Sequence, residues 1–124
     1  MNNRSVSEIG SHQEQENKIQ SLSRIYQLRG DRTVTDFIRE NTILLELLFE
    51  SNQKIREYFG SDVQVILELL VDPEAGDYRE LFALVLTELK PEEALERLEK
   101  LDNEWWLEVS LLAKGLLNID VEYI

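Results

Sequence analysis

Carboxylates are the reactive groups that this sequence supplies in quantity, and one short segment gathers four of them. The segment DPEAGDYRE (72–80) combines the turn-forming residues proline and glycine with the acids Asp72, Glu74, Asp77 and Glu80. Calcium requires about six to eight oxygen ligands around a turn that glycine allows, but the D-x-[DN]-x-[DN]-G spacing of a calcium-binding loop is absent. We therefore expect a solvated hairpin loop. The alternative is a protein that binds a divalent cation or small ligand through these acids or through carboxylates on a sheet face.

The scarcity of cysteine and histidine excludes several other kinds of catalysis. There is no cysteine, which excludes disulfides, thiolate zinc sites and cysteine nucleophiles. His12 is the single histidine, so one chain cannot build a Ser-His-Asp triad or a multi-histidine metal site. No spacing singles out a carboxylate pair for acid–base catalysis. The sequence predicts a protein that is not an enzyme and that carries no cofactor.

The acidic charge is concentrated after residue 33. The net charge is −12 at pH 7; residues 1–33 hold five Lys/Arg and four Asp/Glu, whereas residues 34–124 hold eight Lys/Arg and 21 Asp/Glu. Binding nucleic acid requires Lys and Arg side chains that replace counterions along the phosphate backbone, so we expect no nucleic-acid partner. A basic protein partner fits this charge better, although acidity also serves simply to keep a protein in solution.

Length and hydropathy predict a globular protein of the cytoplasm. The 124 residues are 43% apolar and 31% charged, which is typical of one folded domain. The amino terminus lacks the continuous apolar stretch of a secretory signal. No run reaches the roughly 18 apolar residues of a membrane span. We expect no membrane partner.

The pattern of apolar residues divides the chain into an extension and a domain. Residues 1–33 are predicted to be a polar extension with a short amphipathic helix over 16–29, and residues 34–124 a single α+β domain. Helical spacing in the domain predicts a turn or two capped by Thr35, and then helices over 41–59 and 91–115, opened by Asn41 and Pro91. Alternating apolar residues predict strands over 63–71, 80–89 and 117–123.

The predicted element order is α-α-β-β-α-β. The first two strands form an antiparallel hairpin, and the last helix returns the chain so that the third strand is parallel to the second. The most economical arrangement sets the third strand beside the first. The sequence therefore predicts a three-stranded sheet of order 2-1-3 with the helices on one face.

One face of this predicted sheet mixes acids with aliphatic and aromatic residues, because strand parity places them together. The acids are Glu68, Glu88, Asp120 and Glu122, and the apolar residues are Ile66, Leu70, Phe82, Leu84 and Leu86. Such a mixture suits an interface better than a sheet washed by solvent. Two alternatives stay open: the helix over Ile19–Tyr26 folds over this face, or two copies pair face to face, although their acids would repel.

The sequence contains two tryptophans, which are adjacent in LDNEWWLEV (101–109). Successive residues of an α-helix point about 100° apart, so one narrow stripe cannot bury both equally. Counting from Leu98 places Trp105 in the core and Trp106 at its boundary. Either the helix breaks at Asp102 and buries a second face, or Trp106 joins an exposed apolar patch with Leu107 and Leu111.

Five segments of the chain from Val34 onward are distinctive: TDFIREN (35–41), IREYFG (55–60), DPEAGD (72–77), PEEALERLEKLDNEWWLEV (91–109) and NIDVEY (118–123). Through these segments the chain resembles a family of small uncharacterised bacterial proteins that is common in cyanobacteria. The resemblance implies no activity, cofactor or catalytic residue. The residues favour a non-enzymatic interaction or regulatory module, antitoxin-like in character, that binds a basic or amphipathic protein; Trp106 is included among its candidate contact residues.

Overall fold

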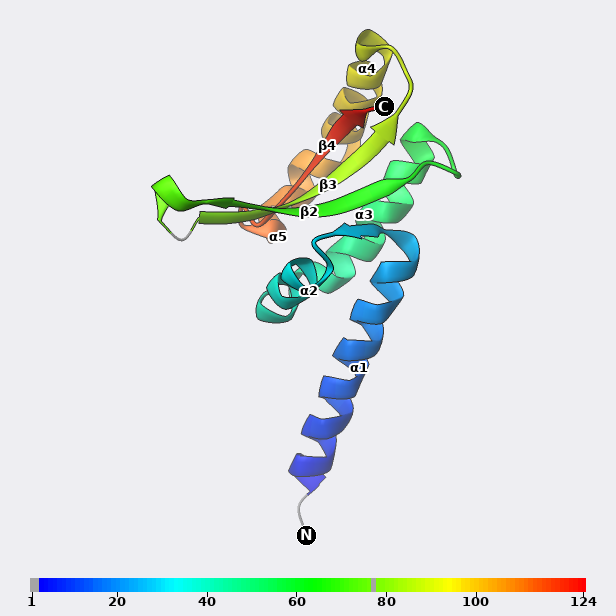
Figure 1. Ribbon diagram of the computed structural model, residues 1–124. Helices are drawn as coiled ribbons and strands as arrows, with labels where there is room; N and C mark the ends of the chain where they lie inside the picture. The colour runs from blue at the N-terminus through cyan, green and yellow to red at the C-terminus, as the bar shows by residue number, and fades with distance from the viewer. Residues whose placement is uncertain (1–2, 77) are drawn as a thin grey trace.

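The computed structural model describes residues 3–76 and 78–124 and has an α+β fold (Figure 1). Its helices are α1 (Asn3–Ile25), α2 (Asp31–Glu40), α3 (Leu44–Phe59), α4 (Pro91–Leu101) and α5 (Leu107–Ala113). Its strands are β1 (Gln27–Arg29), β2 (Val65–Asp72), β3 (Tyr78–Thr87) and β4 (Leu117–Tyr123). A 3₁₀ turn at Pro73–Ala75 joins β2 to β3, and a π-helical segment, Asp102–Trp106, joins α4 to α5.

The strands form one mixed sheet of order β1-β2-β3-β4, so the predicted three-stranded sheet of order 2-1-3 is wrong. β2 and β3 are the antiparallel hairpin, β1 runs parallel to β2, and β4 runs parallel to β3. The carboxyl-terminal strand therefore lies beside the second strand of the hairpin and not beside the first.

The cause of this difference is β1, which occupies the edge of β2 that the predicted arrangement assigned to the last strand. Three residues are too few to show an alternating pattern, so no periodicity in the sequence predicts β1. Tyr26, which directly precedes β1 and is 3% exposed, fixes the position of this strand. Its hydroxyl donates a hydrogen bond to the Leu48 carbonyl oxygen at 2.7 Å. The Asn52 amide also donates to the Ile25 carbonyl oxygen at 3.0 Å. With this edge filled, β4 pairs with the free edge of β3.

The helix boundaries around Gly30 and Asn41 also differ from the sequence prediction. α2 begins at Asp31, directly after Gly30, whose φ of 76° is the left-handed conformation that glycine adopts without strain. Thr35 therefore lies inside this helix. Asn41 ends α2 and does not open α3; its side-chain amide donates to the Phe37 carbonyl oxygen at 2.9 Å.

The core lies between the helices and one face of the sheet, which we call the covered face (Figure 1). Alternate strand residues on this face are fully buried, including Leu67, Leu81, Ala83 and Val85. They pack in one cluster with residues of α1, α2, α3, α4 and α5. Among the described residues, Phe82, Leu84 and Leu86 of the opposite face are not part of this cluster, and we call that face the open face.

The helical segment after Pro91 stays continuous but changes phase at Asp102. The Leu107 amide donates to the Asp102 carbonyl oxygen, the i to i+5 bond of a π-helix. Leu101 and Trp106 are five residues apart and would point about 140° apart on an α-helix; with the extra residue both are buried, at 0% and 5% exposure. The prediction that Trp105 is the core tryptophan is therefore wrong.

Candidate interaction surface

The open face brings together most of the residues that the sequence placed there. In register across the sheet, one row holds Ile66, Leu84 and Asp120, and the next holds Glu68 and Phe82. Leu86 pairs with Glu122 in a third row. Leu70 and Glu80 pair with each other nearer the hairpin turn. The face therefore has an apolar centre with carboxylates on β2, β3 and β4.

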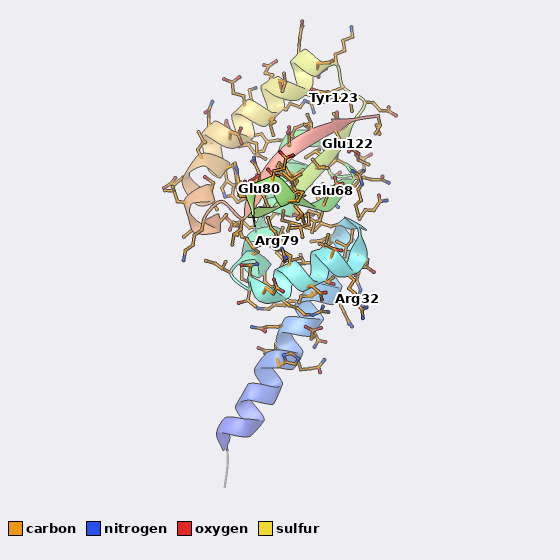
Figure 2. The ribbon with its side chains drawn as sticks, turned by 60° about the vertical axis from the view of Figure 1, so that its left-hand side comes forward. Arg32, Glu68, Arg79, Glu80, Glu122 and Tyr123 are labelled. Atoms are coloured by element: carbon orange, nitrogen blue, oxygen red, sulfur yellow. The ribbon has the colours of Figure 1, made fainter. Side chains whose placement is uncertain are left out.

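Arg29 is a residue of this face that the sequence patterns do not predict. Its guanidinium donates to Glu68 Oε2 at 2.9 Å and makes a two-armed contact with Glu122, at 3.0 Å to Oε1 and 2.8 Å to Oε2. Figure 2 shows Glu68 and Glu122 side by side over the strands. One arginine thus links β1, β2 and β4.

This ion pair crosses the whole sheet. Neighbouring strands lie about 4.8 Å apart, so β1 and β4 are separated by three such spacings, or roughly 14 Å. The Arg29 and Glu122 side chains must extend toward each other over the side chains of β2 and β3 to meet. Ile66, beneath their path, is only 4% exposed although it lies outside the helix-covered core. The methylene stems of long charged side chains cover apolar surface in this way.

Arg29 also sets the electrostatics of the face. Its hydrogen bonds hold the pKa of Glu122 below the usual value of 4.5. The two glutamates in turn raise the pKa of Arg29, with Glu122 the larger contributor. Glu68 and Glu122 are therefore already paired with a cation within the chain. The structure shows no such pair for Asp120 among residues 3–76 and 78–124; its Oδ1 accepts the Val121 amide at 2.8 Å.

Glu88 lies past the end of β3, at a groove beside the sheet. This groove has a volume of about 620 Å³ and is lined by residues that include Phe59, Asp62, Leu86 and Leu89. Leu86 is shared between the open face and the groove. Leu86 is therefore part of the predicted surface. Glu88 lies beside that surface but does not join the rows of the sheet.

Trp106 belongs neither to the open face nor to the groove, because it is buried in the core beneath the helices. Trp105 is only partly buried and packs against the edge of this core, and its indole N–H donates to Glu50 Oε1 at 3.1 Å. The two ring centroids are 5.7 Å apart. Leu107 and Leu111 do face solvent, at 59% and 79% exposure.

The acids of the hairpin loop do not converge on a cation site within the described part of the chain. Asp72 Oδ1 accepts the Glu74 amide at 3.0 Å, and Glu80 accepts the Tyr78 hydroxyl at 2.5 Å. Asp77 lies outside the described residues. Residues 3–76 and 78–124 contain no cluster of three or more acids or histidines that could hold a metal ion.

Comparisons of the chain with protein-family models, with curated proteins and with solved structures find no match. The resemblance to small bacterial proteins therefore stays a prediction. Within residues 3–76 and 78–124, no helix has both the length and the apolar character needed to cross a membrane.

Proposed function

We propose that the protein is a non-enzymatic regulatory module that binds a basic, amphipathic segment of a partner protein on the open face of its sheet. The observation that carries this proposal is the mixture of side chains on that face. Phe82 and Leu84 form a partly exposed apolar strip beside the buried Ile66, and Glu68, Asp120 and Glu122 stand around it. Protein interfaces combine an apolar centre with a polar rim in the same manner.

The contact between Arg29 and the two glutamates supports a cationic partner. Within one chain, a guanidinium already binds across this face to carboxylates on two strands. The side chains of this ion pair are 35–42% exposed, so water and a second cation can reach them. A lysine or arginine of a partner would meet the same carboxylates, and Asp120 and Glu80 in addition.

The net charge of the chain also supports a cationic partner. Residues 34–124 hold 21 acids and eight bases, so a positively charged segment is drawn to this body and an acidic one is repelled. Steering of this kind acts on the association rate and weakens as ionic strength rises, because the Debye length falls from about 10 Å at 0.1 M salt to about 3 Å at 1 M.

A synthetic peptide in which lysine alternates with leucine tests the proposal on the intact protein. We expect backbone amide NMR shifts to move at Ile66, Leu84 and Asp120, and the affinity to fall as salt is raised. A matched peptide with glutamate in place of lysine should leave these signals unmoved. Shifts confined to Leu107 and Leu111 would place binding on α5 instead and refute the sheet-face proposal.

A further inference from the structure

The groove at the end of the sheet, which we call the end groove, has a chemical character of its own. Its apolar lining comes from four regions of the chain: Phe59 at the end of α3, Val63 before β2, Leu86 with Leu89 around the end of β3, and Ile124 after β4. Asp62 and Glu88 are its acids, and the lining contains no Lys or Arg. Its volume of about 620 Å³ is ample for one or two side chains of a binding partner.

Both acids stand on turns that are held by hydrogen bonds. Thr87, which is 5% exposed, accepts the Leu89 amide on its Oγ1 at 3.1 Å and so fixes the turn that carries Glu88. The Arg56 guanidinium donates to the Ser61 carbonyl oxygen, and the Val63 amide donates to the Gly60 carbonyl oxygen at 3.3 Å, which fixes the turn that carries Asp62. The entropy of ordering these loops is therefore already lost before a ligand arrives.

The end groove is continuous with the open face. Leu86 lines the groove and also lies on the open face, opposite Glu122 in register. A segment that crosses the open face toward the end of β3 therefore passes from Glu122 over Leu86 to the groove.

We propose that the end groove receives the anchor of the partner segment: an aliphatic side chain with a lysine or arginine beside it, bound by Asp62 and Glu88. This inference rests on the proposed function and identifies the partner's chemistry at one end of the same surface. The argument from charge is direct, because two carboxylates and no base line the groove, beside apolar side chains and the uncharged Gln64 and Thr87. A second copy of this chain is disfavoured as the occupant because its body is strongly acidic.

Fluorescence anisotropy with the labelled lysine–leucine peptide and the full-length protein tests the inference. The variant Asp62→Asn with Glu88→Gln removes both groove charges and keeps side-chain size. The control variant Glu92→Gln with Glu96→Gln makes the same change in net charge on the exposed side of α4. We expect the groove variant to weaken binding about threefold to tenfold, as loss of two rim charges does, and the control to change it by less than about twofold.

A second peptide, in which serine replaces leucine, separates the apolar requirement from the charge. We expect this peptide to bind the wild type more weakly than the leucine peptide does. The difference in affinity between the groove variant and the control variant should also be smaller for this peptide. Equal weakening of both double variants would overturn the inference, since net charge alone would then explain binding. Loss of binding on Asp120→Asn with unchanged binding of the groove variant would overturn the end-groove anchor and leave the proposed function standing. No binding of either peptide to the wild type would overturn both.

Discussion

The covered and open faces of the sheet are built by the same strands and yet are stabilised by different means. On the covered face, Leu67 is fully buried beneath helices. Its neighbour Glu68 points to the other side, where the ion pairs of Arg29 with Glu68 and Glu122 take the place of a helical layer. A sheet can therefore shield apolar residues such as Ile66 with long charged side chains, although this cover is weaker and more adaptable than a layer of helices.

The largest effect is expected in the helical layer of the covered face. Replacing Trp106 by alanine should lower the free energy of unfolding by about 3–5 kcal/mol, because it removes a large buried ring. Trp105→Ala should cost less, about 1–2 kcal/mol, because that ring is only partly buried and the change removes one hydrogen bond to Glu50. Urea unfolding of the two variants measures the difference. A larger loss at Trp105 would contradict the phase change at Asp102.

Matched leucine truncations compare the two faces directly. Leu67→Ala should cost about 2–5 kcal/mol, since Leu67 is fully buried under helices. Leu84→Ala, on the open face of the adjacent strand, should cost less, about 1 kcal/mol, because Leu84 is only partly buried and its truncation leaves no enclosed cavity. Denaturant titrations under one set of conditions give both values. Equal losses would mean that the open face is covered as thoroughly as its counterpart.

Removal of Arg29 probes the cover of the open face. Arg29→Ala should lower the thermal midpoint by less than Leu84→Ala does, because the ion pair is partly exposed and screened by water. The same change frees Glu68 and Glu122, so affinity for the lysine–leucine peptide should rise. Arg29→Lys keeps the charge and loses the two-armed contact. Its thermal midpoint and its affinity for the peptide should lie between those of the wild type and Arg29→Ala. Weaker peptide binding by Arg29→Ala would show that Arg29 helps to hold the partner.

The pH dependence of this ion pair has a definite sign. The folded-state pKa of Glu122 is lowered by its hydrogen bonds to Arg29. Its contribution to stability is therefore present above its ordinary pKa of 4.5 and is lost as pH falls through the lowered value. As pH is lowered, the free energy of unfolding should therefore decrease less in Glu122→Gln than in the wild type. Parallel titration curves would exclude this role.

The smallest effect is expected at Asp102, in the π-helical segment. Burial and the nearby charges of Asp120 and Glu99 raise its pKa above the usual 3.8. The ionised form of Asp102 is thus disfavoured in the folded state. The free energy of unfolding therefore falls as pH rises through the raised pKa and this carboxylate ionises. Asp102→Asn should raise the thermal midpoint slightly near neutral pH and have no such effect below pH 3.8. A stability loss at neutral pH would instead assign the carboxylate a structural bond.

Strand parity could be read from the sequence for most of the candidate surface. Glu68, Phe82, Asp120 and Glu122 share one face because each occupies the same parity along its strand. Period-two alternation is a local property, and any pairing of these strands that buries the apolar parity leaves these residues together.

Arg29 and Trp106 could not be placed in this way. Arg29 lies in a strand of three residues whose position depends on the burial of Tyr26 and on its hydrogen bond with Leu48. Trp106 enters the core because one extra residue in the turn at Asp102 rotates the rest of the helix. Both outcomes depend on contacts between residues far apart in the sequence.

The sequence by itself determined the periods of the helices and strands, the acidity of the body and the mixed character of one sheet face, because each follows from neighbouring residues. The tertiary structure alone decided the strand order, the tryptophan that is buried, and the cation that pairs with Glu68 and Glu122. These choices depend on which edges and cavities remain free once the other elements have packed.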